Sequence, residues 1–180
     1  MLRLAPALQR LTDWDAAACL RVNRISRRPW PRRLFRAVSR LGDGVFWYAL
    51  LLALAVGGGG ERGPAAALQL ALTGLACTAL YKWLKGRTAR PRPYAVRPDI
   101  VCAAAPLDRF SFPSGHTLHA VGFTVVALAH YPALAPLLVP FTVLVALSRP
   151  ALGLHYPSDV LAGAALGALV ACLSLLIAPV

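Results

Sequence analysis

The stretch FSFPSGHTLHAVGFTVVALAHYPALAPLLVPFTVLVALS, residues 110–148, contains no Asp, Glu, Lys or Arg. A helix needs about 17–25 predominantly apolar residues to cross a bilayer, so this stretch is long enough for two crossings. Tyr131-Pro132, with Pro136 close behind, supplies a break, because proline lacks a backbone donor and disfavours helix in the residue before it. The stretch therefore predicts two membrane helices joined near Tyr131.

Three further stretches carry no charged residue: 44–60, 63–81 and 160–180. The chain is 58% hydrophobic with a mean hydropathy of +0.60, which is more apolar than an ordinary soluble domain. Together with the two crossings in 110–148, these stretches predict an all-α integral membrane protein, a bundle of about five transmembrane helices. Short connections between the helices favour a single domain over residues 1–180, with the transmembrane core at 44–180.

Residues 1–43 precede the first predicted crossing and are basic. Within them, the segment 2–20 carries two Arg and two Asp residues, and each charge at the centre of a membrane helix costs about 2.5–3.5 kcal/mol. We therefore expect an interfacial helical segment on the membrane surface instead of a crossing or a cleaved signal. Its apolar residues alternate with the charged ones: Leu4, Leu8, Leu11 and Trp14.

The net charge of +12 comes from basic residues that flank apolar stretches. This placement favours anionic lipids at a basic face as partners and argues against nucleic acid. The four cysteines have no metal-ligand spacing, and we expect neither a metal site nor another cofactor. They are Cys19, Cys77, Cys102 and Cys172.

Polar residues gather in three segments at the ends of predicted crossings: 85–93, 113–116 and 148–159. The first lies in an Arg- and Pro-rich loop over residues 82–112, a length that marks a connection as functional or disordered. That loop ends one crossing and begins the next, so it shares its membrane face with residues 148–159. Side chains from the three segments can therefore meet at one end of the bundle.

These segments carry the residue types that bind phosphate. Lys85, Arg92 and Arg149 supply positive charge, and Arg adds planar two-point contacts. Ser114 and the Gly115 amide add short donors where a helix is expected to begin, and unpaired amides at a helix N-terminus favour anions. The segments therefore indicate a phosphate ester as substrate.

Two histidines fit covalent cleavage of such an ester, which needs a nucleophile on one side and an acid for the leaving oxygen on the other. Asp159 follows His155 by four residues, so its carboxylate can hold one imidazole nitrogen protonated while the other attacks. His155 is therefore the predicted nucleophile and His116 the predicted general acid. His119 and His130 are interpreted as satisfied interfacial residues, although His119, three residues after His116, could line the same pocket.

The three segments together resemble the signature of the type 2 phosphatidic acid phosphatase family: Lys-x6-Arg-Pro, then Pro-Ser-Gly-His, then Ser-Arg-x5-His-x3-Asp. Every signature position is filled, by Lys85, Arg92, Pro93, residues 113–116, Ser148, Arg149, His155 and Asp159. The resemblance implies that five residues bind phosphate, namely Lys85, Arg92, Ser114, Gly115 and Arg149. It further implies that His116 protonates the leaving group and that His155 becomes phosphorylated with support from Asp159. Similar membrane members commonly have six crossings, and the interfacial segment here stands in place of the first.

Resemblance to small bacterial members favours undecaprenyl diphosphate as the lipid, then phosphatidate and phosphatidylglycerol phosphate, and a multi-pass location in the inner cell membrane. Two alternatives stay open. One is a vanadate-dependent haloperoxidase, whose phosphate-like cofactor is held by a similar constellation but whose relatives are soluble. The other is a non-catalytic lipid-binding membrane protein.

The side of the membrane is predicted in two opposite ways. The face with the catalytic loops carries 18 of the 19 Lys and Arg, all except Arg62, which favours the cytoplasm. Similar bacterial phosphatases, in contrast, often work on the outer face. The oligomeric state is not indicated.

Overall fold

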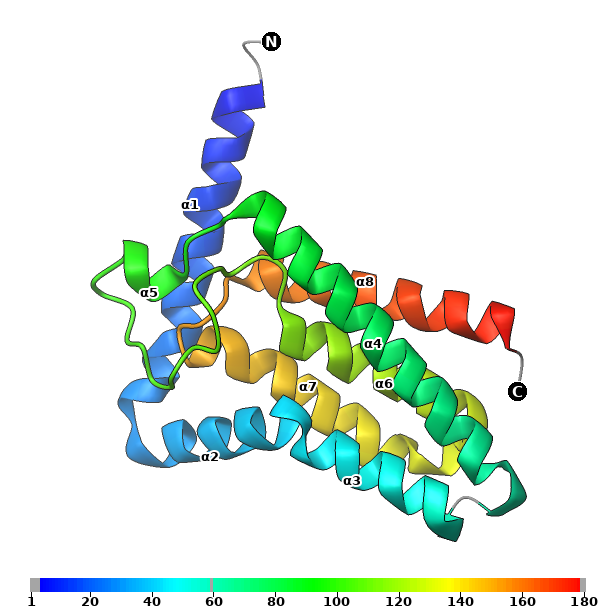
Figure 1. Ribbon diagram of the computed structural model, residues 1–180. Helices are drawn as coiled ribbons and strands as arrows, with labels where there is room; N and C mark the ends of the chain where they lie inside the picture. The colour runs from blue at the N-terminus through cyan, green and yellow to red at the C-terminus, as the bar shows by residue number, and fades with distance from the viewer. Residues whose placement is uncertain (1–3, 59, 179–180) are drawn as a thin grey trace.

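The computed structural model describes residues 4–58 and 60–178, and most of these are helical (Figure 1). The longer helices are α1 (Leu4–Asn23), α2 (Pro29–Arg40), α3 (Phe46–Ala53), α4 (Gly63–Thr88), α6 (Gly115–His130), α7 (Ala135–Ala151) and α8 (Pro157–Ile177). Short helical turns complete the chain: η1 (Arg24–Arg27), η2 (Leu41–Val45), η3 (Leu54–Gly58), η4 (Gly60–Arg62), α5 (Pro93–Val96) and η5 (Pro132–Leu134).

Four helical rods have the length and apolar composition needed to cross a membrane: Pro29–Gly57, Gly60–Thr88, Pro132–Ala151 and Pro157–Ile177. The shorter α6, with 16 residues, lies among them and packs against α8, α4 and α7 (Figure 1). Large leucine side chains of α4, α7 and α8 are exposed on the outside of the bundle, as lipid-facing surfaces require. The prediction of an all-α membrane bundle is confirmed.

The most extensive helix packing joins α6 to α8 and depends on glycine. A Cβ at Gly163 would lie 2.6 Å from the Ser114 carbonyl oxygen, and one at Gly167 would meet the Leu118 carbonyl oxygen even more closely. Small residues allow helix backbones to approach each other inside a membrane. This packing brings the starts of α6 and α8 together, where the Ser114 amide donates to the Asp159 carbonyl at 3.0 Å.

The first rod is kinked where α2 passes into α3. Asp43 (φ −83°, ψ 23°) and Gly44 (φ 122°, ψ −40°) leave helical geometry inside η2, and glycine adopts such a φ without steric cost. The sequence placed the start of this crossing at Gly44, whereas the rod begins at Pro29 and has its kink at that boundary. The difference arises because the basic residues of α2 hide its continuity with α3 in a search for uncharged stretches.

The N-terminal helix α1 projects from the bundle at its start and packs against the interhelical loops at its end (Figure 1). Asp15, Cys19 and Asn23 lie four residues apart on one side and are all buried. The Asn23 side chain donates to two backbone carbonyls at 2.9 Å each. The second half of α1 is therefore part of the packed core. Of the side chains that predicted an interfacial helix, Trp14 is exposed and the three leucines lie outside the described side chains.

Candidate active site

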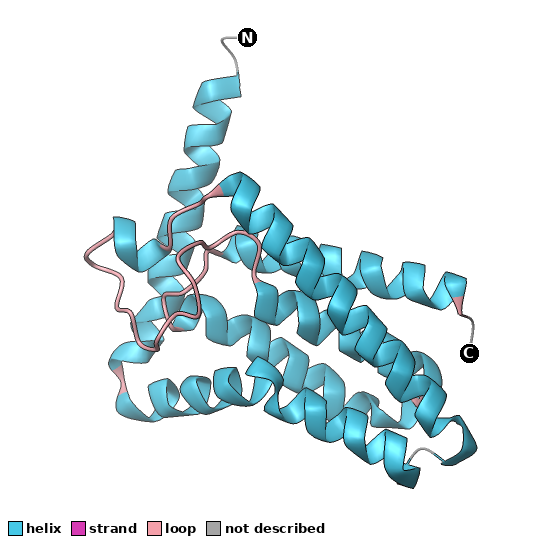
Figure 2. Cartoon of the chain, viewed as in Figure 1, coloured by secondary structure: helices cyan, strands magenta, loops and turns pink. Residues whose placement is uncertain are grey.

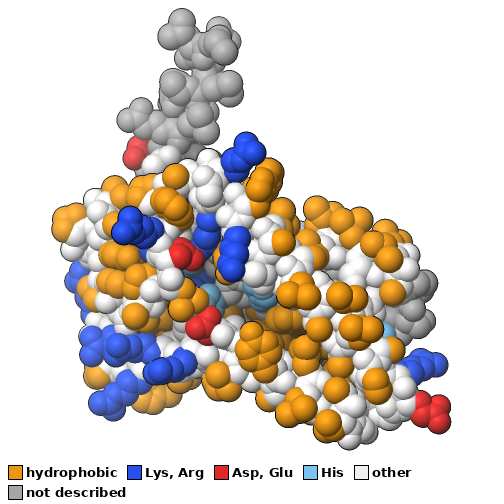
Figure 3. All heavy atoms as spheres, viewed as in Figure 1, with side chains coloured by type: hydrophobic (Ala, Val, Ile, Leu, Met, Phe, Trp, Pro, Cys, Tyr) orange, Lys and Arg blue, Asp and Glu red, His pale blue; other side chains and the backbone are white. Residues whose placement is uncertain are grey.

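A cavity of about 840 Å³ lies between α4, α6, the kink of the first rod and the loop that precedes α6. In the space-filling view, histidine side chains are visible inside a hollow with charged side chains around it (Figure 3). Six of the eight residues singled out from the sequence line the cavity: Lys85, Arg92, Gly115, His116, Arg149 and His155. The loop between α5 and α6 crosses this end of the bundle and brings the separate segments together (Figure 2).

Lys85 and Arg92 both bind the carboxylate of Asp108. Lys85 Nζ lies 2.6 Å from Asp108 Oδ2, and Arg92 Nη2 lies 2.9 Å from Asp108 Oδ1. Arg92 Nε also donates to the Asp108 backbone carbonyl at 2.9 Å, and Lys85 Nζ donates to the Phe110 carbonyl at 3.2 Å. Partial burial raises the pKa of Asp108, but Lys85 and Arg92 more than offset this effect, so the pKa lies below 3.8 and the carboxyl is ionised. The two cations therefore already share one anion.

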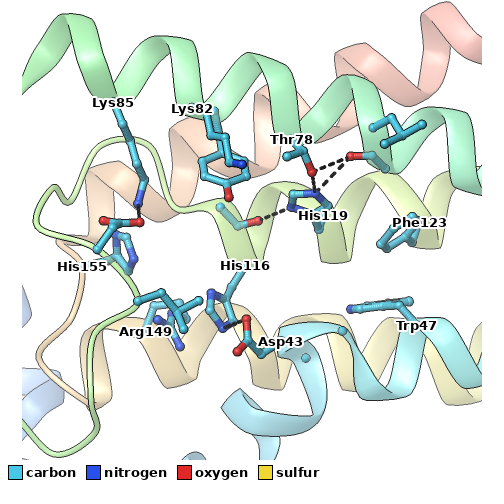
Figure 4. Close-up of a pocket in the computed structure, with 18 of the residues that line it drawn as sticks. Asp43, Trp47, Thr78, Lys82, Lys85, His116, His119, Phe123, Arg149 and His155 are labelled. Atoms are coloured by element: carbon cyan, nitrogen blue, oxygen red, sulfur yellow. Dashed lines mark hydrogen bonds and ion pairs between the residues drawn. The ribbon is translucent and has the colours of Figure 1, made fainter.

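Arg149, near the end of α7, has no carboxylate partner among the described residues. Its side chain is 2% exposed, and Nη1 donates to Ser39 Oγ while Nε has no hydrogen-bond partner there. A buried charge without a counterion is costly. This guanidinium therefore suits an anionic ligand, and in Figure 4 it lies beside His116 and His155.

His155 lies in the turn between α7 and α8 and is buried. Its Nδ1 is 2.6 Å from the Ser111 backbone carbonyl, which can only accept, so the hydrogen is on Nδ1. Nε2 lies 3.3 Å from Arg92 Nη1. Burial first, and then the three nearby cations, lower the pKa of His155 well below 6.5. The ring is therefore neutral, with the lone pair of Nε2 on the side of the cations.

The Asp159 carboxylate lies close to His155 but does not hydrogen-bond to it. Its Oδ2 lies 3.7 Å from His155 Nδ1, beyond hydrogen-bond distance, and instead accepts from the Tyr156 amide at 2.8 Å, which caps the start of α8. Its Oδ1 pairs with Arg90 at 2.6 Å, and Arg90 also pairs with Asp15 of α1 at 2.7 Å. Burial lowers the pKa of Arg90, but the two carboxylates outweigh this effect and raise the pKa above its ordinary value. Asp159 thus supports the turn that carries His155.

His116 lies in the first turn of α6, and its Nε2 is 3.4 Å from Asp43 Oδ1 (Figure 4). The kink at Gly44 makes this approach possible. Gly115 lines the cavity, whereas Ser114 is fully buried behind it and shares a hydrogen bond of 3.0 Å with Thr117 Oγ1. Ser114 therefore caps α6 and positions its first amides.

Sequence reasoning missed Asp43 and Asp108 and left His119 open. His119 lines the cavity, with Nδ1 2.8 Å from the Gly115 carbonyl and Nε2 3.0 Å from Thr78 Oγ1. A signal for the two carboxylates existed: the chain has only seven acidic residues against 19 basic ones, and Asp43 stands between two glycines beside an apolar stretch. Among residues 4–58 and 60–178, no group of three or more His, Cys, Asp or Glu residues could hold a metal ion.

A cavity among membrane helices, with three cations around a neutral imidazole, is suited to phosphoryl transfer on a lipid headgroup. Comparison with known proteins agrees with this class. Residues 66–179 match the model of the PAP2 superfamily, and the chain belongs to this family. It is a membrane enzyme of the lipid phosphate phosphatase class.

A match to one curated relative and matches to two solved structures support this assignment. Phosphatidylglycerophosphatase B of Bacillus subtilis (strain 168) is 32% identical over 158 residues, which cover 80% of this chain and 73% of the relative. The crystal structure of a transmembrane PAP2 type phosphatidylglycerolphosphate phosphatase from Bacillus subtilis has a TM-score of 0.73 at 29% identity, and covers 91% of this chain and 84% of its own. The crystal structure of Aquifex aeolicus LpxE has a TM-score of 0.77 at 28% identity, with 88% and 93% covered.

Proposed function

We propose that the protein hydrolyses a terminal phosphate of a membrane lipid through a phosphohistidine on His155, without a metal ion. The observation that carries the proposal is the environment of His155. A carbonyl holds its Nδ1 hydrogen, so Nε2 carries the lone pair that can attack. Arg92 Nη1 donates to this Nε2 at 3.3 Å, and Lys85 and Arg92 lie around the same cavity. The third cation, Arg149, has no carboxylate partner among the described residues and can compensate the charge of the phosphate.

In the proposed first step, His155 Nε2 forms a bond to phosphorus while the bond from phosphorus to the lipid oxygen breaks, and His116 gives a proton to that oxygen. In the second step, water attacks the phosphorus and loses a proton to His116, the P–N bond breaks and inorganic phosphate leaves. The cations stabilise the charge on the transferred group in both steps. Asp43, 3.4 Å from His116 Nε2, orients the His116 ring.

For the substrate we propose phosphatidylglycerol phosphate ahead of undecaprenyl diphosphate, the reverse of the order that the sequence favoured. The change rests on the relative that is 32% identical, a phosphatidylglycerophosphatase. Apolar residues line the cavity beyond the charged end, including Trp47, Leu51 and Leu75, and suit the start of a lipid tail. Either lipid would present its phosphate to the cations with its tail in the bilayer.

The test is phosphate release by the protein purified in detergent, across a panel of lipid phosphates and with excess chelator. We expect activity on phosphatidylglycerol phosphate to persist in chelator and to be inhibited by vanadate, which mimics the transition state. Rapid quenching should trap protein-bound phosphate that is stable in base and labile in acid. Loss of activity in chelator, or absence of trapped phosphate in single-turnover experiments, would contradict the mechanism.

We further propose that the basic surface of α2 rests on anionic lipid headgroups of the cell membrane. Eight arginines of η1, α2 and their neighbours are exposed: Arg21, Arg24, Arg27, Arg28, Arg32, Arg33, Arg36 and Arg40. Trp30, also exposed, suits an interfacial anchor. Single cysteines at Ala104 and at Glu61, in a cysteine-free background, can be labelled on intact cells with an impermeant reagent. Labelling at Glu61 alone would place the active site on the cytoplasmic side, as the arginines predict.

A further inference from the structure

The carboxylate of Asp108 occupies the donors that a phosphate would need. Its two oxygens accept from Lys85 at 2.6 Å and from Arg92 at 2.9 Å, and Oδ1 also accepts from the Phe110 amide at 3.1 Å. Figure 4 shows the Lys85 side chain extending from α4 toward His155 and ending in this ion pair. A phosphate that takes the positions of the Asp108 oxygens on both cations must therefore displace this resident anion.

The Asp108 side chain is placed so that it can move away from Lys85 and Arg92. Its side chain is 37% exposed, whereas the side chains of Lys85 and Arg92 are 9% and 2% exposed. It belongs to the loop between α5 and α6, and its neighbours Leu107 and Arg109 are exposed. Lys85 and Arg92 are thus buried, while the carboxylate reaches them from an exposed part of the loop.

The exchange depends on the charge of the incoming phosphate. A terminal phosphate carries close to two negative charges at neutral pH, because its second pKa is about 6. A phosphodiester carries only one. Replacing the carboxylate with a diester leaves the charge beside Lys85 and Arg92 unchanged, whereas replacing it with a terminal phosphate adds one negative charge next to them. Only the second exchange is favoured by the cations.

We propose that Asp108 is a specificity-determining residue that keeps singly charged phosphodiesters out of the phosphate site. The cavity opens among helices that lie in a bilayer, where phosphodiester headgroups are abundant and terminal phosphates are rare. A fixed cation pair without a resident anion would be occupied by those headgroups. The inference rests on the proposed role of Lys85 and Arg92 as phosphate ligands.

The test uses Asp108→Asn, which keeps the size of the side chain and removes its charge. Binding of inorganic phosphate and of dimethyl phosphate, a soluble diester, is measured by calorimetry on the detergent-purified protein at pH 8. We expect Asp108→Asn to strengthen dimethyl phosphate binding about tenfold and to narrow the gap between the two ligands. In mixed micelles, phosphatidylglycerol should become a stronger competitive inhibitor of the variant than of the wild type.

Asp99→Asn is the matched control, since Asp99 lies in the same loop and, among the described residues, forms its ion pair with the exposed Arg97. Both binding constants should be unchanged in it. An unchanged ratio of the two constants in Asp108→Asn, or equal weakening of both, would overturn the proposal and leave Asp108 a scaffold for Arg92. If Asp108→Asn does not fold, Asp108→Glu is measured instead. This variant keeps the charge, so it must still bind inorganic phosphate more tightly than dimethyl phosphate by the wild-type ratio. Loss of that ratio in Asp108→Glu would equally overturn the proposal. Calorimetry measures binding without turnover. A failure of the proposed function would therefore be seen in the phosphate-release assay and not in these binding constants.

Discussion

Two cavities near opposite ends of α4 each contain a histidine, and they differ in charge. The cavity at the end of α4 holds His155 among Lys85, Arg92 and Arg149. The cavity near the start of α4, of about 590 Å³, holds His130, whose Nε2 lies 2.6 Å from Gln69 Oε1. No charged side chain is among the described residues that line this second cavity.

Hydrogen bonds join polar groups that line the neutral cavity to each other. Gln69 Nε2 donates to the carbonyls of Ser174 and Ala178 at 3.1 and 3.0 Å, and Thr73 Oγ1 lies 3.1 Å from Ser174 Oγ. Such a cluster joins α4, α6 and α8 within the membrane, although His130 Nδ1 has no hydrogen-bond partner among the described residues. The lining of the charged cavity instead contains four cations, Lys82, Lys85, Arg92 and Arg149, and two carboxylates, Asp43 and Asp108. Excess positive charge, and not a histidine alone, distinguishes the proposed phosphate site from the neutral cavity.

The strongest test of this comparison replaces each of the two histidines, His155 and His130, by alanine. We expect His155→Ala to lower the rate of phosphate release by at least about 10³-fold, because the nucleophile is lost. The matched variant His130→Ala should keep the wild-type rate. A residual rate of His155→Ala within about tenfold of wild type would refute its role, and a comparable loss in His130→Ala would refute the distinction between the cavities.

A smaller loss is expected at the general acid. His116→Ala should slow lipid phosphate hydrolysis by about 10²–10⁴-fold, but p-nitrophenyl phosphate much less, because its leaving group needs little protonation. Asp43→Asn should show the same pattern with a smaller amplitude, since Asp43 only orients the ring. The rates for both substrates are compared in each variant. Equal loss for the two substrates would count against the acid role.

The excess positive charge around His155 should also affect the pH dependence of kcat/KM. His155 attacks only when it is neutral, so kcat/KM falls as the pH drops through its pKa, which burial and the cations hold below 6.5. In Arg149→Gln burial remains but one cation is gone, so the pKa of His155 rises and the acidic limb moves to higher pH. Arg109→Gln, exposed and outside the cavity lining, is the control. Because the same substrate is used with all three proteins, its own ionisation affects each pH profile equally. An acidic limb at the same pH in Arg149→Gln as in the wild type would contradict the argument.

The smallest effect concerns stability around the charged end. Arg90→Gln leaves Asp15 and Asp159 buried without their shared cation, which should cost about 3 kcal/mol and lower Tm by roughly 6–12 °C in detergent. Arg97→Gln, which breaks the exposed pair with Asp99, should leave Tm unchanged. Thermal unfolding of both variants decides whether the Arg90 pairs hold α1 to α8. Equal Tm values would show that they do not.

By itself the sequence determined the class of fold and six of the residues around the cavity. Uncharged length is a local property of the chain, and it predicted the membrane helices because the bilayer fixes how many apolar residues a crossing needs. The phosphate-binding segments were recognisable because their residue types and spacings are local too. Lys85, Arg92, Gly115, His116, Arg149 and His155 all line one cavity, as residues of shared chemistry on one face should.

Only the tertiary structure decided how these side chains are held. The kink at Gly44 brings Asp43 to His116, and the loop before α6 brings Asp108 to Lys85. The expected partner of His155, Asp159, serves the helix cap and Arg90, while a backbone carbonyl takes its place. Such pairings join residues far apart in the chain, and they depend on which backbone atoms the packing of helices and loops leaves within hydrogen-bond distance. Spacing in sequence carries no record of that distance.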